Sequence, residues 1–227
     1  MDSKMTTSLC INTCSMDPEA GKGSSSGKKP YAQREFVLRN FILPNAINDP
    51  FIDEGIVVGS WEEGAGYTYV PAPSINFNCT DTLHQRQAAF DASSGDLVIF
   101  CHDDHLLDLT FNGMRFNLEG YMRSHEVDVL VPARWTRLRN VAGERLNSGE
   151  PGMWPQATKY QHIKGYIPGH CAIYKREVIE RCPWSDVDKV FVWDTAHTET
   201  IRNNGFFIIH SNICRVWDVE QGSTPWR

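Results

Sequence analysis

The sequence predicts a single α/β domain with a mostly parallel central sheet flanked by helices. Short apolar runs of strand type alternate with segments of helical spacing along the first half of the chain. Residues 55–61 (GIVVGSW) and 97–101 (LVIFC) are apolar over most of their length, which is typical of strands that are covered on both faces. The 227 residues fit one large domain or two small ones and can bury a sizeable core. Alternation of strands and helices favours a parallel sheet between two helical layers.

The first half of the chain supplies most of these elements. Residues 7–15 (TSLCINTCS) predict a first strand, and the Gly-, Ser- and Lys-rich residues 17–29 predict a mobile loop. Residues 34–48 have helical spacing, with Pro44 bending or ending the helix. A third strand is predicted at residues 67–70 and a helix at residues 81–93.

The second half is less regular. Residues 127–132 (VDVLVP) predict a strand, and residues 134–166 are loop-like, being rich in Trp, Arg, Gly and Pro. A short helix is predicted at 175–181, and a second at 194–204 that ends at Asn204-Gly205. Residues 206–210 (FFIIH) predict a last strand.

Composition excludes several classes of protein. The net charge of −6 argues against a nucleic-acid-binding protein, which normally carries a basic face. No apolar run approaches the length of a membrane span, so we expect no integral membrane segment. The seven cysteines are scattered and form no CxxC pair, which favours reduced thiols and a cytoplasmic protein.

The residues most suggestive of chemistry are His102-Asp103-Asp104-His105, which follow the apolar strand at 97–101. Ligands of open α/β sheets bind at the carboxyl ends of strands. Carboxylates beside imidazoles suit Mn²⁺ or Mg²⁺ better than Zn²⁺. The alternative is a polar turn whose aspartate caps the following segment.

Residues 92–104 (ASSGDLVIFCHDD) resemble the acidic-motif block of glycosyltransferases with the GT-A (Rossmann-like) fold, and are most similar to family 2. The resemblance implies a divalent cation, Mn²⁺ or alternatively Mg²⁺, that bridges the two phosphates of a sugar nucleotide. His102 occupies the first Asp position of the family motif. Asp104 is therefore the expected metal ligand, with His102 and the later His210 as further ligands and Asp103 as a nucleotide contact. The register Asp103-x-His105 stays open.

Other segments follow the order of the same family. Residues 165–172 (GYIPGHCA) resemble its glycine turn below the donor sugar, and Val192-Trp193-Asp194 resembles its late acidic block, with Asp194 in the catalytic position. Besides Asp103, the residues expected to bind the nucleotide-sugar are Asn12, Thr13, Ser60, Arg86, Gly169 and His170.

The resemblance implies a metal-dependent enzyme that transfers a hexose from a nucleotide-sugar donor to a carbohydrate or other hydroxyl acceptor. Residues 6–104 would form the nucleotide-binding half and residues 105–227 the acceptor-binding half. A UDP-sugar is the expected donor, and GDP- and dTDP-sugars stay open. Asp194 as general base predicts inversion at the anomeric carbon; a retaining enzyme and a non-catalytic nucleotide-sugar- or carbohydrate-binding module are the alternatives. The sequence carries no signal for the oligomeric state.

Overall fold

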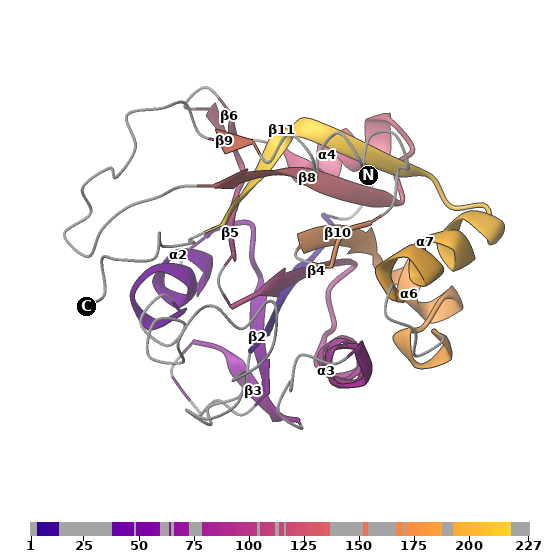
Figure 1. The fold of residues 1–227 in the computed structure, drawn as a ribbon. Coiled ribbons are helices and arrows are strands. Elements are labelled where there is room, and N and C mark those ends of the chain that lie inside the picture. Colours follow the sequence, from indigo (N-terminus) through magenta and orange to yellow (C-terminus); the bar gives the residue numbers. More distant parts are fainter. Residues whose placement is uncertain are drawn as a thin grey trace.

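The molecule is built around a mixed sheet of nine strands (Figure 1). The computed structural model describes residues 4–13, 38–47, 49–59, 64, 66–72, 79–103, 105–111, 114–115, 117–136, 152–153, 167–169, 171–187 and 193–218. The strands are β1 (Thr7–Asn12), β2 (Glu54–Gly59), β3 (Thr68–Pro71), β4 (Leu97–His102), β5 (His105–Asp108), β8 (Val129–Thr136), β9 (Gly152–Met153), β10 (Cys171–Lys175) and β11 (Ile208–Asp218). A separate two-stranded ribbon pairs β6 (Thr110–Phe111) with β7 (Met114–Arg115).

The strands lie in the order β3-β2-β1-β4-β10-β8-β11-β5, with β9 paired to β8. Strands β3, β2, β1 and β4 are mutually parallel, and β11 is parallel to β8. β10 runs antiparallel to both of its neighbours, and β5 runs antiparallel to β11. The predicted mostly parallel sheet is therefore confirmed. The reversal of β10 brings its amino end beside the carboxyl end of β4, with Cys171 opposite Cys101.

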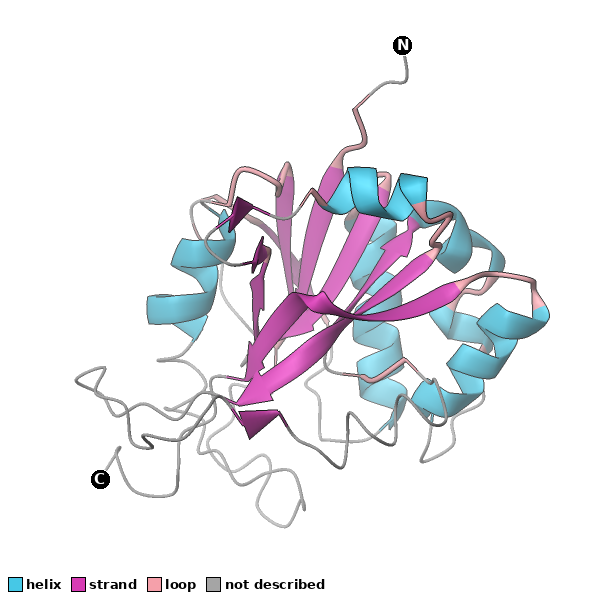
Figure 2. Cartoon of the chain, turned by 90° about the horizontal axis from the view of Figure 1, so that it is seen from above, coloured by secondary structure: helices cyan, strands magenta, loops and turns pink. Residues whose placement is uncertain are grey.

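Helices cover both faces of the sheet (Figures 1 and 2). One face, here called the α3 face, packs against α3 (Cys79–Ala92), α6 (Arg176–Arg181), α7 (Trp193–Asn203) and the 3-10 turn η2 (Trp184–Asp186). The other, the α2 face, packs against the π-helical turn η1 (Leu38–Ile42), α2 (Leu43–Ile47) and α4 (Leu118–Ser124). No helix in the described ranges has the length and apolar character needed to cross a bilayer.

Side chains alternate between these faces along each strand, as a pleated sheet requires. In β4, Val98 and Phe100 belong to the core of the α3 face, whereas Leu97, Ile99 and Cys101 belong to that of the α2 face. All five are buried. This explains why the sequence of β4 is apolar at every one of these positions.

Most of the predicted elements are present. The strands predicted at 55–61, 67–70 and 97–101 are β2, β3 and β4, and the helices predicted at 81–93, 175–181 and 194–204 are α3, α6 and α7. The strand predicted at 7–15 is β1 as far as Asn12, and the helix predicted at 34–48 is present as η1 and α2. Pro44 is the second residue of α2 and directly follows the junction with the π-helical turn η1. Proline has no backbone N–H group that could donate to the preceding turn, so a change of helix type at this point suits it.

The structure also adds to the prediction. Strands β5 and β10 and helix α4 had not been predicted, and the strand predicted at 206–210 continues to Asp218. The predicted mobile loop at 17–29 lies outside the described residues. In the loop-like segment at 134–166, the structure describes the end of β8 and the short strand β9.

Candidate functional site

Three strand ends bring predicted site residues to the same edge of the sheet. The register pairs Asn12, the last residue of β1, with His102 at the end of β4 and with Val58 near the end of β2. The Asp103 N–H donates to the carbonyl oxygen of Asn12 at 3.0 Å, and the Thr13 N–H donates to that of Val58 at 2.9 Å. The carboxyl edge of the parallel strands is where open α/β sheets bind ligands.

Asn12 is the most informative of these residues. Its side chain is 1% exposed, yet neither Oδ1 nor Nδ2 has a hydrogen-bond partner in the described part of the chain. A buried amide without partners costs free energy, so such groups are rare and call for an explanation. By strand alternation from Cys10 and Phe100, the side chains of Asn12 and His102 share the α3 face. Asn12 is thus placed to bind a polar ligand at this edge.

Gly59 shapes the backbone beside Asn12. Its φ of +135° is one that side chains rarely adopt, and a Cβ at this position would lie 3.0 Å from the Thr13 carbonyl oxygen. Thr13 is held in turn by Gln85 of α3, whose Nε2 donates to the Thr13 carbonyl at 3.2 Å. The ends of β1 and β2 therefore approach closely because residue 59 is glycine. Ser60, the next predicted site residue, lies outside the described residues.

The acidic motif divides between the two faces of the sheet. His102 is half-buried and Asp103 is 3% exposed. His105 opens β5 and is 4% exposed; its ring lies 5.8 Å from that of His102, nearly perpendicular to it. Asp104, the predicted metal ligand between them, is outside the described residues.

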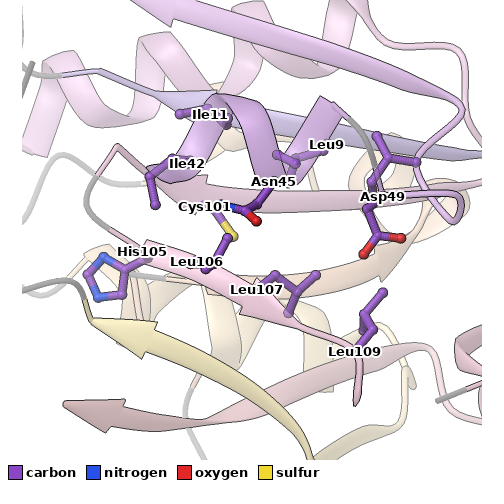
Figure 3. A pocket seen from close by; sticks show the side chains of 12 residues that line it. Leu9, Ile11, Ile42, Asn45, Asp49, Cys101, His105, Leu106, Leu107 and Leu109 are labelled. Carbon is purple, nitrogen blue, oxygen red and sulfur yellow. The ribbon is translucent and has the colours of Figure 1, made fainter. Parts of the chain in front are cut away.

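His105 lies at one end of a small cavity on the α2 face (Figure 3). The cavity has a volume of about 20 Å³, which is room for about one water molecule. Its walls are mainly leucine and isoleucine, with polar atoms from Asn45, Asp49 and His105. The cavity is too small for a nucleotide. It lies on the opposite face of the sheet from the side chains of Asn12 and His102.

His210 occupies the third position of β11 and is half-buried. The strand order places β10 and β8 between β4 and β11, so about 14 Å of sheet separates the strands that carry His102 and His210. No three His, Cys, Asp or Glu side chains in the described ranges are grouped as a metal centre would need. The ligand set of Asp104, His102 and His210 stays a prediction, in which Asp104 is the undescribed member.

The predicted glycine turn lies next to the edge formed by Asn12 and His102. Ile167 and Gly169 precede β10, whose first residue, Cys171, is opposite Cys101. The Ile167 N–H donates to Thr198 Oγ1 of α7 at 2.8 Å, and Thr198 Oγ1 donates to the Asp194 carbonyl at 2.6 Å. The turn is thereby fixed to the first turns of α7. His170, the other predicted residue of the turn, lies outside the described residues.

Asp194 lies near the start of α7 and is half-buried. Burial raises the pKa of the Asp194 carboxyl above its usual value, while the Thr195 N–H, which donates to Oδ1 at 2.9 Å, and the charge of Arg86 both oppose that rise. A half-buried carboxylate with a raised pKa is a stronger base than a solvated one, which suits proton abstraction from a hydroxyl group.

Arg86, predicted to bind the nucleotide-sugar, lies in the interior of the protein. It lies on α3, is fully buried, and donates from Nη2 to the carbonyl oxygen of Gly169. The structure therefore places Arg86 beneath the glycine turn. Arg86 is also close enough to Asp194 for their charges to interact.

Sequence reasoning missed the contributions of Trp193 and Thr198. A Cβ added to Gly169 would lie 2.9 Å from Trp193 Cζ2, so the indole packs directly against the turn. Thr198 is the residue that joins Ile167 to Asp194. Its position four residues after Asp194 is the signal that could have identified it, since residues i and i+4 share one face of a helix.

No protein-family model matches the sequence, and no curated protein matches it. Among solved structures, residues 1–349 of TarS from S. aureus match 94% of this chain and 60% of that chain, with a TM-score of 0.55 and 13% identity. A longer TarS structure matches 95% of this chain and 37% of that chain, with a TM-score of 0.53 and 12% identity. The chain thus spans less than two thirds of each TarS chain. TarS is a GT-A glycosyltransferase, so the likeness shows that this chain has an α/β fold of the GT-A type, as predicted.

Proposed function

We propose that the chain is a metal-dependent glycosyltransferase that transfers a hexose from a nucleotide-sugar to a hydroxyl acceptor. One observation carries the proposal. On a GT-A fold, the reversed strand β10 brings the Gly169 turn beside the end of β4, where His102 and Asp103 lie. Helix α7 fixes Asp194 against the same turn. The proposed donor-binding strand ends, the acidic motif and the candidate base Asp194 would therefore lie around the same glycine turn.

The donor would bind along the ends of β1, β2 and β4. The buried amide of Asn12, which has both a donor and an acceptor available in the described structure, fits a polar ligand such as a nucleoside. Thr13, Ser60 and Asp103 would complete the nucleotide contacts, with a UDP-sugar as the expected donor. Residues 6–104 then form the nucleotide-binding half.

A divalent cation, Mn²⁺ or alternatively Mg²⁺, fits the chemistry of the acidic motif. Carboxylate oxygens with an imidazole nitrogen form a donor set that such ions accept. Asp104 and His102 would hold the ion, with His210 as a further candidate ligand. When bound, the ion would neutralise the diphosphate and its developing charge as the leaving group departs. In a protein with a net charge of −6, such a counter-charge would favour binding of the diphosphate.

Asp194 would act as the general base. Its oxygen would accept the proton of the acceptor hydroxyl as that oxygen attacks the anomeric carbon, and the bond to the nucleoside diphosphate breaks on the opposite side of the sugar. Such a displacement inverts the anomeric centre. Gly169 and His170 would lie below the donor sugar, and the acceptor would bind residues of the 105–227 half.

A donor screen tests the proposal. Release of nucleoside diphosphate is measured with UDP-, GDP- and dTDP-sugars in the presence of candidate hydroxyl acceptors, with Mn²⁺ or with chelator. We expect release that is lost with chelator and in Asp104→Ala, and turnover that is lost in Asp194→Asn with donor binding retained. Asp186→Asn, at an exposed position of η2, serves as the control and keeps activity.

The alternative outcomes decide between functions. Nucleotide-sugar binding without any release would indicate a non-catalytic binding module. Retention of anomeric configuration in the product would remove Asp194 as the base of an inverting reaction. Neither release nor a thermal shift with any nucleotide-sugar plus Mn²⁺ would refute the proposal, because ligands that bind the folded state raise its apparent stability.

A further inference from the structure

Arg86 is a positive charge in the interior of the protein. Its side chain is fully buried, and Nη2 donates a hydrogen bond to the Gly169 carbonyl. Within the described part of the chain, Nε and Nη1 have no hydrogen-bond partner, and no carboxylate forms a salt bridge with the guanidinium. A buried charge without a close counter-ion is costly. An apolar side chain of similar volume would avoid that cost, so packing alone does not account for Arg86.

Aromatic rings stand in for a counter-ion. The guanidinium carbon lies 5.0 Å from the ring centroid of Trp184, 5.0 Å from that of Trp193 and 5.3 Å from that of Phe100. Cations at such distances are attracted to the faces of aromatic rings. The rings come from η2, α7 and β4, so three separate elements hold the guanidinium in place.

Arg86 contacts both Gly169 in the glycine turn and Trp193 at the start of α7. It donates to the Gly169 carbonyl and lies over the ring of Trp193, and that same ring packs against Gly169. Trp193 immediately precedes Asp194. If the guanidinium were displaced, the contact between Gly169 and Trp193 would therefore loosen, and Trp193 is the residue next to Asp194, the candidate base.

The charge of Arg86 also reaches the base. Burial raises the pKa of Asp194, and the positive charge of Arg86 opposes that rise. Among the described residues, the other titratable groups that interact with Arg86 include Tyr174 and Cys171 of β10, Cys101 of β4 and His197 of α7. Burial raises the pKa of Tyr174 and that of Cys171 and lowers that of His197 to about 3, so these three groups are neutral near pH 7. Arg86 is then the charged neighbour, among the described residues, that favours an ionised Asp194.

We propose that Arg86 is a positioning residue that acts through the Gly169 turn, Trp193 and Asp194 and does not contact the donor. The inference rests on the proposed function in one respect, since it takes Asp194 as the base. It assigns Arg86 a different role from the donor contact expected from sequence. Two consequences follow: loss of the guanidinium should slow turnover more than it weakens donor binding, and it should make Asp194 harder to ionise.

The test compares Arg86→Met, which removes the charge, with Arg86→Lys, which keeps it. The titration of Asp194 is followed by the ¹³C resonance of its carboxyl carbon, assigned with Asp194→Asn. We expect the pKa of Asp194 to rise in Arg86→Met, because the opposing positive charge is lost, and to stay near the native value in Arg86→Lys. Where turnover is measured, both variants should lower kcat about tenfold or more while the donor KM stays within about threefold.

Arg176 supplies a matched control. It also lies over an aromatic ring, 4.7 Å from the centroid of Phe90, and also donates to a backbone carbonyl, that of Gly95. It lies at the opposite end of β4, where its own N–H donates to the Asp96 carbonyl. Arg176→Met should therefore lower stability without moving the Asp194 titration or the ratio of kcat to KM.

Two results would overturn the inference: an unchanged Asp194 titration in Arg86→Met, or a raised donor KM at unchanged kcat, which would indicate direct donor contact. The titration requires no turnover, so it stands apart from any failure of the proposed function. If Arg86→Met does not fold, Arg86→Lys decides alone through the carbonyl ¹³C resonance of Gly169. That resonance should shift, because lysine lacks the planar guanidinium group that donates to the Gly169 carbonyl. An unchanged Gly169 resonance would refute the positioning role.

Discussion

His197 makes folding stability depend on pH in a window that can be stated in advance. The imidazole is 1% exposed, lies 3.6 Å from the ring of Trp184, and donates from Nε2 to the Cys182 carbonyl at 2.8 Å. Burial lowers the pKa of His197 from 6.5 to about 3, with a smaller contribution in the same direction from the charge of Arg86. The folded protein therefore keeps His197 neutral at pH values where the unfolded chain protonates it.

The sign of the effect follows from linkage. Because the folded-state pKa is lowered, the unfolded chain binds more protons between about pH 3 and pH 6.5, and stability falls as pH falls through that window. One pKa unit corresponds to about 1.4 kcal/mol, so acidification from pH 7 to pH 5 should cost about 2 kcal/mol at this one residue. That is a large fraction of the ~5–15 kcal/mol that stabilises a typical domain.

Urea unfolding followed by tryptophan fluorescence measures this cost. The native protein is compared with His197→Gln, whose side-chain amide can still donate to the Cys182 carbonyl. We expect the free-energy difference between the two proteins to shrink by about 2 kcal/mol from pH 7 to pH 5. His84→Gln, at an exposed position of α3, controls for the loss of a histidine that stays in solvent. A difference that does not change with pH would refute the assignment of a neutral, buried His197.

Three further substitutions test the local structure. Gly59→Ala should lower stability by about 1–3 kcal/mol because of the φ of +135°, measured by thermal unfolding, whereas Gly55→Ala, with its nearest neighbour at 3.5 Å, should cost clearly less; equal effects would contradict the strain argument. Burial alone would raise the pKa of Glu54, but hydrogen bonds to its carboxylate lower it below the usual value, so Glu54→Gln should flatten the loss of stability below about pH 4.5, checked by acid titration of unfolding. Thr198→Val should leave the Ile167 N–H without an acceptor and cost about 1–3 kcal/mol, seen in urea unfolding; an unchanged midpoint would mean that water replaces the hydroxyl group.

The sequence predicted those elements whose side chains are buried on a regular pattern. Strand β4 is buried from Leu97 to Cys101, so its apolar run is visible without any tertiary information. Strand β10 was overlooked although Cys171 to Tyr174 are also fully buried. Its residues include Ala and Cys, which have weaker strand preference than Val or Ile, and it follows directly from the glycine turn. Nothing local indicates that it runs antiparallel to β4, because strand direction depends on the connections on either side.

Arg86 shows more clearly where sequence reasoning ends. An arginine on a helix is normally a solvent-facing residue, and its neighbours in α3 carry no signal to the contrary. What buries it are the rings of Phe100, Trp184 and Trp193, which lie 14, 98 and 107 positions further along the chain. Arg86 was predicted from the sequence to bind the nucleotide-sugar, and its tertiary packing limits the ways in which it could act on a ligand. A side chain that must cross a protein interior to reach its target acts through what it touches on the way, here the Gly169 carbonyl and the ring that precedes Asp194.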